Sequence, residues 1–420
     1  MSANSIQPLD VELSSASAPS IKVTSEPIPH AAVDAQHSIE LATNTSQVSA
    51  LRDDWQDLPT DPNGDLDFYL TVLQSHQEIV RPHVVVLRKS GKAKSIVLGR
   101  IEEKPLTVPL GYKRVSTRPV RFLMLIHGGV LGEDSEESAS MILDSIQQTL
   151  RNGDADIAWF HGLETNSALY RVAKAAGSVL TKDCFPIQLQ RWRGRLPGSY
   201  DGLLRQLSAN TRHNLKRYSK RLQQAFAGQL EVRSYRGSSD MSTILADTEE
   251  IASKTYLRGL RVGFVNNEET RQLMALAASK GWFRAHILYI AGKPAAFWNG
   301  FLYRRTFYTW TTGYSPEIAD YRPGTFLLQK MFEELCNEGA ADQVDFGFGD
   351  AQYKRDWCDH QHLQASFLLF APNLKGVALN CFRTPLIATS NAARSLLTRA
   401  GALQSLKKLW RARLTKPTRS

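Results

Sequence analysis

The sequence has little cysteine and no long apolar run, and both absences exclude common classes of protein. Its 4 cysteines lie far apart and none is in a CxxC spacing, so neither a disulfide framework nor a zinc ribbon is indicated. No apolar run approaches the roughly 20 residues that a helix needs to cross a bilayer. We therefore expect a cytoplasmic protein that binds no metal.

Acidic residues are absent from the last 60 residues, which carry ten Lys and Arg side chains. The other 41 of the 51 basic residues balance 41 acidic ones, so the net charge of +10 resides in this tail. From Leu386 onward, leucines recur among the basic residues, a pattern typical of an amphipathic helix at an anionic membrane surface. A solvated helix or a frayed tail would account for the same pattern. We expect peripheral contact with the inner membrane face through residues 373–420.

Residues 1–47 are rich in Ser, Ala, Thr and Pro and contain one basic residue, Lys22. We expect a disordered arm, and neither a secretion signal nor a transit peptide. The remaining chain is too long for one ordinary core. It predicts two domains in tandem, at 48–196 and 197–372, because each half leads from a hairpin to a strand, a helix and a strand. The predicted class is α/β (α+β), with a mixed central sheet flanked by helices in each domain.

The second half carries the clearest element pattern. Three strands within 282–312, joined by short turns, predict an antiparallel meander. A helix over 200–224 precedes the meander, and a helix over 325–338 follows it, closed by Gly339 at its carboxyl end. A strand at 343–346 comes next.

The turn before that last helix has the composition of an anion-binding site. Gly324 lets the backbone turn without a Cβ, and Pro323 has no N–H to leave unpaired in the first helical turn. The helix amino terminus supplies donors and the positive end of a dipole. The pattern indicates a pyrophosphate-binding turn, although an ordinary helix start after a Pro-Gly turn would have the same residues.

A second basic feature is the helix around Arg212. Arg212, Lys216 and Lys220 recur at a spacing of four, and Arg217 lies alongside. Like charges at this spacing destabilise an isolated helix, so an anion is expected to compensate them, and a basic helical stripe is the pattern expected for a nucleic-acid partner. A solvated face bridged to carboxylates elsewhere is the competing explanation.

Two segments carry a resemblance to a known family. They are residues 207–217, LSANTRHNLKR, and residues 314–357, which contain PGT, DFGFGD and YK. Both resemble signatures of the GNAT superfamily of acyl-CoA-dependent acyltransferases, in particular its subfamily tied to cellulose and exopolysaccharide biosynthesis. The peptidoglycan aminoacyltransferases of the Fem type share the two-domain arrangement but use aminoacyl-tRNA, so the fold alone does not fix the donor.

The resemblance implies a donor site for acetyl-CoA or another acyl-CoA. Strand 307–312 and the helix from Thr325 would splay apart to admit the pantetheine arm. The N–H groups of Gly324, Thr325 and Phe326 would hold the pyrophosphate, and Arg322 beside Pro323 would add positive charge. The basic helix, through Arg212, Asn214, Lys216 and Arg217, would bind substrate or another anion.

Acyl transfer to an amine needs a base, donors for the oxyanion and an acid for the leaving thiolate. Asp345, at the end of an apolar strand, is the expected base, with Asp350 as the other carboxylate. Tyr353 would donate to the departing sulfur, and Lys354 suits an anionic group of the substrate. Alternatively, either carboxylate caps a helix beginning near Gln352, or pairs with Lys354.

Together these features predict a CoA-dependent N- or O-acyltransferase whose acceptor is a polysaccharide or cell-envelope precursor. The second domain would hold the active site, and the first would be a structural or acceptor-binding partner. Two alternatives stay open: an aminoacyl-tRNA-dependent transferase of the Fem type, the one case in which nucleic acid is an expected partner, and a non-catalytic component of a polysaccharide synthase complex.

Overall fold

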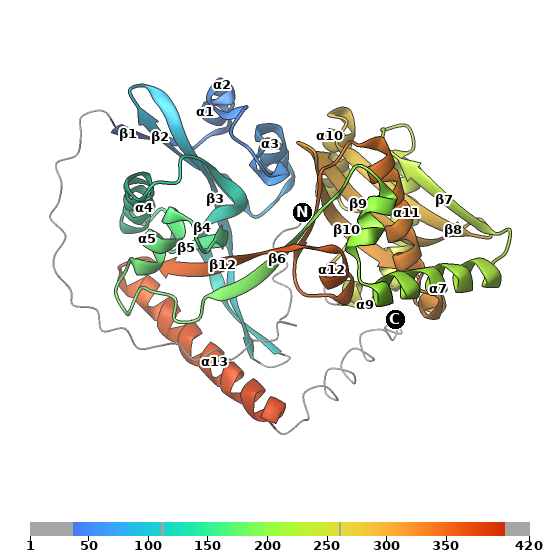
Figure 1. The fold of residues 1–420 in the computed structure, drawn as a ribbon. Helices are drawn as coiled ribbons and strands as arrows, with labels where there is room; N and C mark the ends of the chain where they lie inside the picture. The colour runs from blue at the N-terminus through green and yellow to red at the C-terminus, as the bar shows by residue number, and fades with distance from the viewer. Residues whose placement is uncertain (1–36, 111–112, 260–261, 400–420) are drawn as a thin grey trace.

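The computed structural model describes residues 37–110, 113–259 and 262–399, which form one mixed sheet of twelve strands with helices on both faces (Figure 1). The strand order is β1-β2-β3-β4-β5-β12-β6-β11-β10-β9-β8-β7. Two neighbouring pairs, β4 with β5 and β10 with β11, are parallel, and the other pairs are antiparallel. The strands are β1 (His37–Ala42), β2 (Ile79–Lys89), β3 (Lys92–Leu110), β4 (Lys113–Gly132), β5 (Ile157–Glu164), β6 (Ile187–Arg195), β7 (Leu230–Tyr235), β8 (Phe283–Ile290), β9 (Lys293–Tyr303), β10 (Thr306–Tyr314), β11 (Gln343–Phe348) and β12 (His360–Phe370). The predicted α/β class, with helices flanking mixed sheets, is confirmed.

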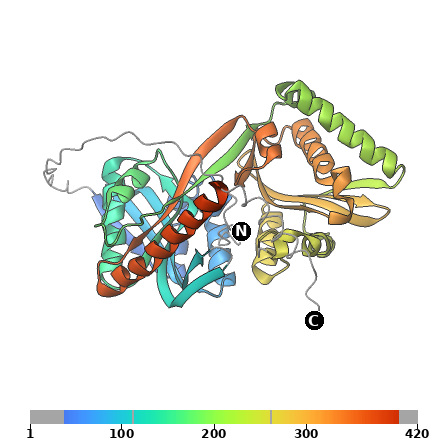
Figure 2. The ribbon, with the colours of Figure 1, turned by 90° about the horizontal axis from the view of Figure 1, so that it is seen from below.

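The helices cover both faces of this sheet. They are α1 (Thr45–Ala50), α2 (Arg52–Trp55), α3 (Leu66–Ser75), α4 (Glu136–Arg151), α5 (Ala168–Ala175), α6 (Tyr200–Gln206), α7 (Ala209–Ala225), α8 (Met241–Lys254), α9 (Tyr256–Gly259), α10 (Glu268–Ser279), α11 (Pro323–Glu338), α12 (Gln352–Trp357) and α13 (Leu374–Arg399), with 3-10 turns η1 (Pro62–Gly64) and η2 (Pro316–Tyr321). Helices α7 and α11 lie on one face of the second half, and α8 and α10 lie on the other (Figure 2).

The second half follows the predicted order of elements. β8, β9 and β10 form the antiparallel meander, and β11 returns parallel to β10 after α11. α11 buries the side chains that recur along one side of it, including Leu328, Met331 and Leu335. It ends at Gly339, whose left-handed conformation (φ 60°) agrees with the expected glycine cap.

The two halves are joined because each contributes a strand, β6 or β12, that pairs with a strand of the other half; these are called the exchanged strands. β12, the last described strand, lies between β5 of the first half and β6, and β6 in turn pairs with β11 of the second half. Phe367 on β12 stacks on Phe160 of β5, with ring centroids 4.7 Å apart. The sheet therefore runs without a break from one half into the other, and β12 completes the sheet of the first half.

Two segments differ from the expectations. Residues 37–42 form β1, in register with β2 from His37 opposite Lys89 to Ala42 opposite Val84, so the expected disordered arm does not include them; residues 1–36 lie outside the described residues. The single helix expected over 200–224 is two helices, because Ser208 caps α7 by accepting a hydrogen bond from the Thr211 N–H.

The segment after β12 is helical where it is described. α13 packs Leu379 and Phe382 against β4, β5 and β12, and Arg383 forms a buried ion pair with Asp183. Residues 400–420, which hold much of the predicted amphipathic tail, lie outside the described residues. Among the described helices, none is long and apolar enough to cross a membrane.

Candidate functional site

The predicted anion-binding turn lies where η2 meets α11. Arg322 adopts a left-handed conformation (φ 56°), and its carbonyl accepts hydrogen bonds from the N–H groups of Thr325 and Phe326, both at 3.1 Å. Two of the three donors expected to face an anion are therefore directed at Arg322. The Gly324 N–H donates to no group of the described residues, which leaves it available at the positive end of the helix dipole.

Two aromatic side chains enclose Gly324. Trp298 on β9 donates from Nε1 to the Gly324 carbonyl at 3.2 Å. A Cβ at position 324 would lie 3.3 Å from Cδ1 of Tyr314, which ends β10 and is 45% exposed. Because that distance is shorter than most Cβ contacts, a side chain larger than hydrogen would displace the Tyr314 ring. The Tyr314 ring, which is partly exposed, would have to shift by a few tenths of an ångström to admit a Cβ here.

The strands β10 and β11 pair only at their beginnings. Their parallel register runs from Thr306 opposite Gln343 to Tyr308 opposite Asp345 and then stops. Beyond it, β10 is bulged against β9 between Thr309 and Thr311, and β11 pairs with β6. β10 and β11 therefore part after this pair, as β11 continues along β6. The predicted separation of β10 from the helix that begins at Thr325 stays a prediction.

Asp345 lies at the point where these strands part, and it is 1% exposed. Its Oδ2 lies 2.7 Å from the Nε atoms of both Arg191 and Arg193, on β6, and its Oδ1 accepts the Gly347 N–H at 2.8 Å. Charge-assisted contacts with two guanidinium groups therefore fix the Asp345 side chain between β11 and β6.

Arg191 connects Asp345 to the first half of the chain. Its Nη2 donates to Asp61 at 2.7 Å and its Nη1 lies 2.7 Å from Nε2 of His127. Burial opposes the charge of Arg191, but Asp61 and Asp345 raise its pKa. Burial, and next Arg191, lower the pKa of His127 to about 4. The sequence alone did not predict this network; the alternation of Ile187 and Leu189 with glutamines was the available signal for a strand.

The other predicted catalytic residues lie just beyond β11. Asp350 is exposed and pairs with Arg355, whose hydrogen bond lowers the Asp350 pKa. Tyr353 packs edge to face on Trp298, with centroids 5.6 Å apart. It thereby lies beside the residue that holds Gly324, so the structure connects the two parts of the predicted site.

Lys354 is buried, at 6% exposure, and its Nζ donates to the Phe348 carbonyl at 2.5 Å. It forms no ion pair with any carboxylate of the described residues. Burial lowers its pKa to about 8, so a large part of the population carries a neutral amine at mildly alkaline pH. Lys354 is the one predicted candidate whose environment favours a proton acceptor.

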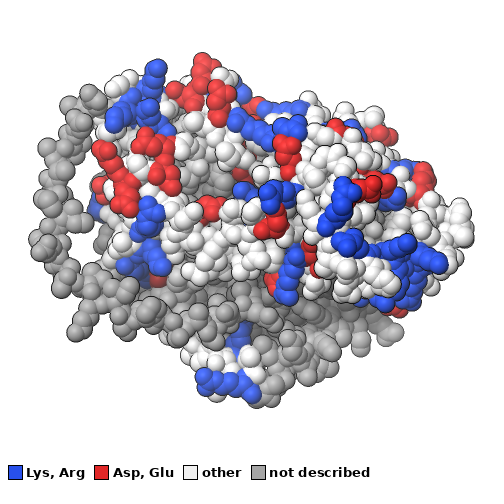
Figure 3. All heavy atoms as spheres, viewed as in Figure 1, with Lys and Arg blue, Asp and Glu red and all other residues white. Residues whose placement is uncertain are grey.

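The basic helix α7 adjoins the anion-binding turn. The Arg322 guanidinium lies 5.8 Å from the ring of Tyr218 on α7, and that of Arg221 lies 5.3 Å from the ring of Tyr321. The two predicted motifs are thus neighbours. Figure 3 shows basic side chains gathered over α7, which contains no acidic residue.

The four predicted anion-binding residues of α7 differ in their contacts. Arg212 donates to the carbonyl of Leu207 at 2.5 Å, and Asn214 contacts Asn210 within the helix. Lys216 and Arg217 are exposed, and neither has an acidic partner among the described residues. The bridged basic face that was the competing explanation is therefore not found for these two. Nor do the described residues contain a group of three or more metal-ligating side chains.

Comparison with known proteins places this site in a known domain type. Residues 209–355 match the family described as "Acetyltransferase (GNAT) domain". No curated protein matches the chain in sequence. Among solved structures, that of FemX is 11% identical with a TM-score of 0.51, covering 77% of this chain and 96% of FemX. At this identity the likeness concerns the fold.

Two further structures have lower TM-scores. A conserved protein of unknown function from Bacteroides thetaiotaomicron VPI-5482 is 11% identical with a TM-score of 0.48, covering 79% of this chain and 100% of that one. A tandem GNAT protein from the clavulanic acid biosynthesis pathway is 11% identical with a TM-score of 0.46, covering 80% and 99%. The family match assigns a GNAT acetyltransferase domain to residues 209–355, and the protein is an acyltransferase.

Proposed function

We propose that the protein transfers an acyl group from acetyl-CoA or another acyl-CoA to an amino or hydroxyl group of a polysaccharide or cell-envelope precursor. One observation carries the donor assignment: at the start of α11, the Gly324 N–H has no partner among the described residues, and Gly324 lies beside Tyr314, on the part of β10 that no longer pairs with β11. The helix start suits the pyrophosphate, and the parted strands suit the narrow pantetheine arm. The acceptor class rests on the resemblance of residues 207–217 and 314–357 to the polysaccharide-associated subfamily.

In this proposal acyl-CoA is held by residues 322–326. Fewer of their N–H groups are available to the pyrophosphate than the sequence predicted. Gly324 supplies the N–H, Arg322 supplies charge above it, and Pro323 fixes the turn. The N–H groups of Thr325 and Phe326, already bonded to Arg322, contribute through the helix dipole.

Burial and a lowered pKa support Lys354 as the base in place of the expected Asp345, whose carboxylate is held by two arginines. The neutral amine of Lys354 would take a proton from the acceptor while the nitrogen or oxygen of the acceptor attacks the thioester carbon. The carbon–sulfur bond then breaks, and the thiolate takes a proton from Tyr353 or from water. Asp345 would position β6 against β11, and Asp350 would hold Arg355.

Calorimetric titration with acetyl-CoA tests the donor. We expect micromolar binding that is lost in Gly324→Trp, because the indole would displace Tyr314 and fill the turn. Gly237→Trp is the matched control, because a Cβ at this exposed glycine would have no other atom within 4 Å. Absence of binding to the unmodified protein would refute the CoA assignment.

A second candidate is the aminoacyl-tRNA-dependent reaction. The observation that favours it is the exposed cluster of cations on α7, which lacks acidic partners among the described residues. It predicts tRNA binding that weakens steeply with salt, with a slope that falls by about one on Arg217→Gln. If total tRNA does not bind at low salt, this candidate is eliminated.

A further inference from the structure

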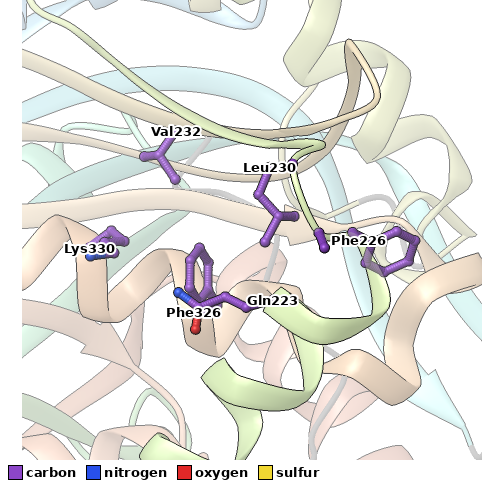
Figure 4. Close-up of a pocket in the computed structure, with 8 residues that line it drawn as sticks. Gln223, Phe226, Leu230, Val232, Phe326 and Lys330 are labelled. Atoms are coloured by element: carbon purple, nitrogen blue, oxygen red, sulfur yellow. The ribbon is translucent and has the colours of Figure 1, made fainter.

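A hollow of about 520 Å³ lies between the end of α7, strand β7 and helix α11, next to the proposed donor turn, with which it shares Phe326 (Figure 4). Its volume is within the range of small-molecule sites. Its walls are mainly apolar. Figure 4 shows Leu230 and Val232 projecting from β7 toward Phe326 of α11, with Phe226 at the end of α7.

The hollow follows from how the edge of the sheet is covered. β7 is the last strand in the sheet, and its alternation turns Leu230 and Val232 toward α7 and α11. α7 buries only Leu215 and Leu222 of its 17 residues and ends at Ala225. The helix therefore does not close over the strand, and Leu230 and Val232 stay partly exposed. Such a surface favours an apolar occupant.

Two lysines lie at or near the rim of the hollow. Lys330, one turn after Phe326, lines it directly, and Lys220 lies one helical turn before the lining residue Gln223. Lys330 pairs with Glu333 at 2.8 Å, but both side chains are more than 40% exposed, so that pair is weak. Lys220 has no acidic partner among the described residues.

We propose that this hollow binds a phosphorylated lipid, with one alkyl chain against the apolar walls and the phosphate held by Lys220 and Lys330. The charge on the rim selects an anionic headgroup, and the walls select a chain. A sugar or a nucleotide would need several polar partners, which the side chains of Phe226, Leu230 and Val232 do not offer. The hollow shares Phe326 with the proposed donor turn, but the lipid proposal does not depend on the transfer reaction.

The test is a titration of the full-length protein with dodecyl phosphate below its micelle concentration. We expect saturable binding, and at least about tenfold weaker binding of both ethyl phosphate and dodecyl maltoside, because each lacks one of the two recognised parts. Equal binding of ethyl phosphate would show an anion site without a chain pocket and overturn the proposal. So would equal binding of dodecyl maltoside, which would indicate a pocket without charge selection.

Two variants locate the site. Ala227→Trp fills the hollow from an exposed lining position, and Lys220→Glu reverses charge on the rim. Each is expected to weaken dodecyl phosphate binding by about tenfold, whereas Arg151→Glu, at an exposed position on α4, is expected to leave it unchanged. Unchanged binding in Ala227→Trp would refute the location.

Acetyl-CoA titration of the same variants separates this site from the donor site. We expect Ala227→Trp to bind acetyl-CoA as the unmodified protein does. Loss of acetyl-CoA binding in that variant would assign the hollow to the donor and overturn the lipid proposal. Absence of acetyl-CoA binding to the unmodified protein, together with retained dodecyl phosphate binding, would refute the donor assignment and leave the lipid site supported.

Discussion

Nε of Arg191 lies 2.7 Å from Oδ2 of Asp345, in an ion pair that is nearly closed to solvent. The same guanidinium donates to Asp61 at 2.7 Å. Asp61 belongs to the first half and Asp345 to the second, so one arginine on the exchanged strand β6 neutralises a buried carboxylate from each.

Arg191→Met is therefore expected to destabilise the protein by about 3–5 kcal/mol, because it leaves two carboxylates buried without their shared cation. Urea unfolding at neutral pH would measure the loss. The control is Arg195→Met on the same strand, whose exposed pair with Asp359 should contribute at most about 1 kcal/mol. Similar losses in the two variants would contradict a special role for Arg191.

Lys354 predicts a rise in stability with alkaline pH. Its pKa is about 8 in the folded protein and 10.5 for an ordinary lysine, so between these values the unfolded chain binds the extra proton. The free energy of unfolding should then rise with pH by about 1.4 kcal/mol per unit across this window. Unfolding curves at pH 7.5 and 9.5 would show it.

In Lys354→Met this contribution should disappear, whereas the exposed substitution Lys92→Met should keep it. The loss of the Lys354 proton should also set the pH dependence of the proposed acyl transfer. Once an acceptor is known, the transfer rate of the unmodified enzyme should rise as the pH increases through about 8. In Lys354→Arg this rise should be absent. A profile unaltered by the substitution would return the base role to a carboxylate or to water.

Two buried histidines predict acid sensitivity. Burial lowers the pKa of both His83 and His127 to about 4. Below about pH 6.5 the unfolded chain protonates them while the folded protein does not, so each should reduce stability by about 1.4 kcal/mol per unit as the pH falls toward 4. His83→Gln should flatten this decline relative to His213→Gln, which alters an exposed side chain. Parallel declines would exclude His83 as a contributor.

The exchanged strand can be tested at Phe367. Phe367→Ala removes the ring that stacks on Phe160 and should cost about 3–5 kcal/mol. Leu363→Ala, on the same strand but 43% exposed, should cost much less. If the halves share one cooperative unit, tryptophan fluorescence and circular dichroism should report a single shifted transition in Phe367→Ala, and two transitions would argue against it.

The sequence predicted the second half better than the first, for physical reasons. Local signals define the helix ending at Gly339, the meander and the turn at Pro323, because each depends on neighbours in sequence. The split of α6 from α7 depends on one cap, Ser208, which lies within a continuous helical pattern. The short strand β1 carries too few alternating residues to stand out from a polar arm.

The sequence identified the residues of the candidate site, but it did not predict which groups surround them. Asp345 and Lys354 were both named from the DFGFGD and YK segments, but their roles depend on what faces them. Arg191 and Arg193 come from a strand about 150 residues earlier, and no local pattern pairs them with Asp345. Likewise, burial of Lys354 follows from the position of α12 beneath the end of β11, which only the assembled sheet determines.

The position of β12 also determines when the sheet of the first half can be completed during synthesis. β5 is complete at Glu164, but the strand that covers its open edge is translated about 200 residues later. At the usual rate of about 5–20 residues per second, the first half waits ten seconds or more with that edge unpaired. Exposed strand edges recruit other chains, so during synthesis this protein is expected to depend on chaperones that shield nascent β-strands.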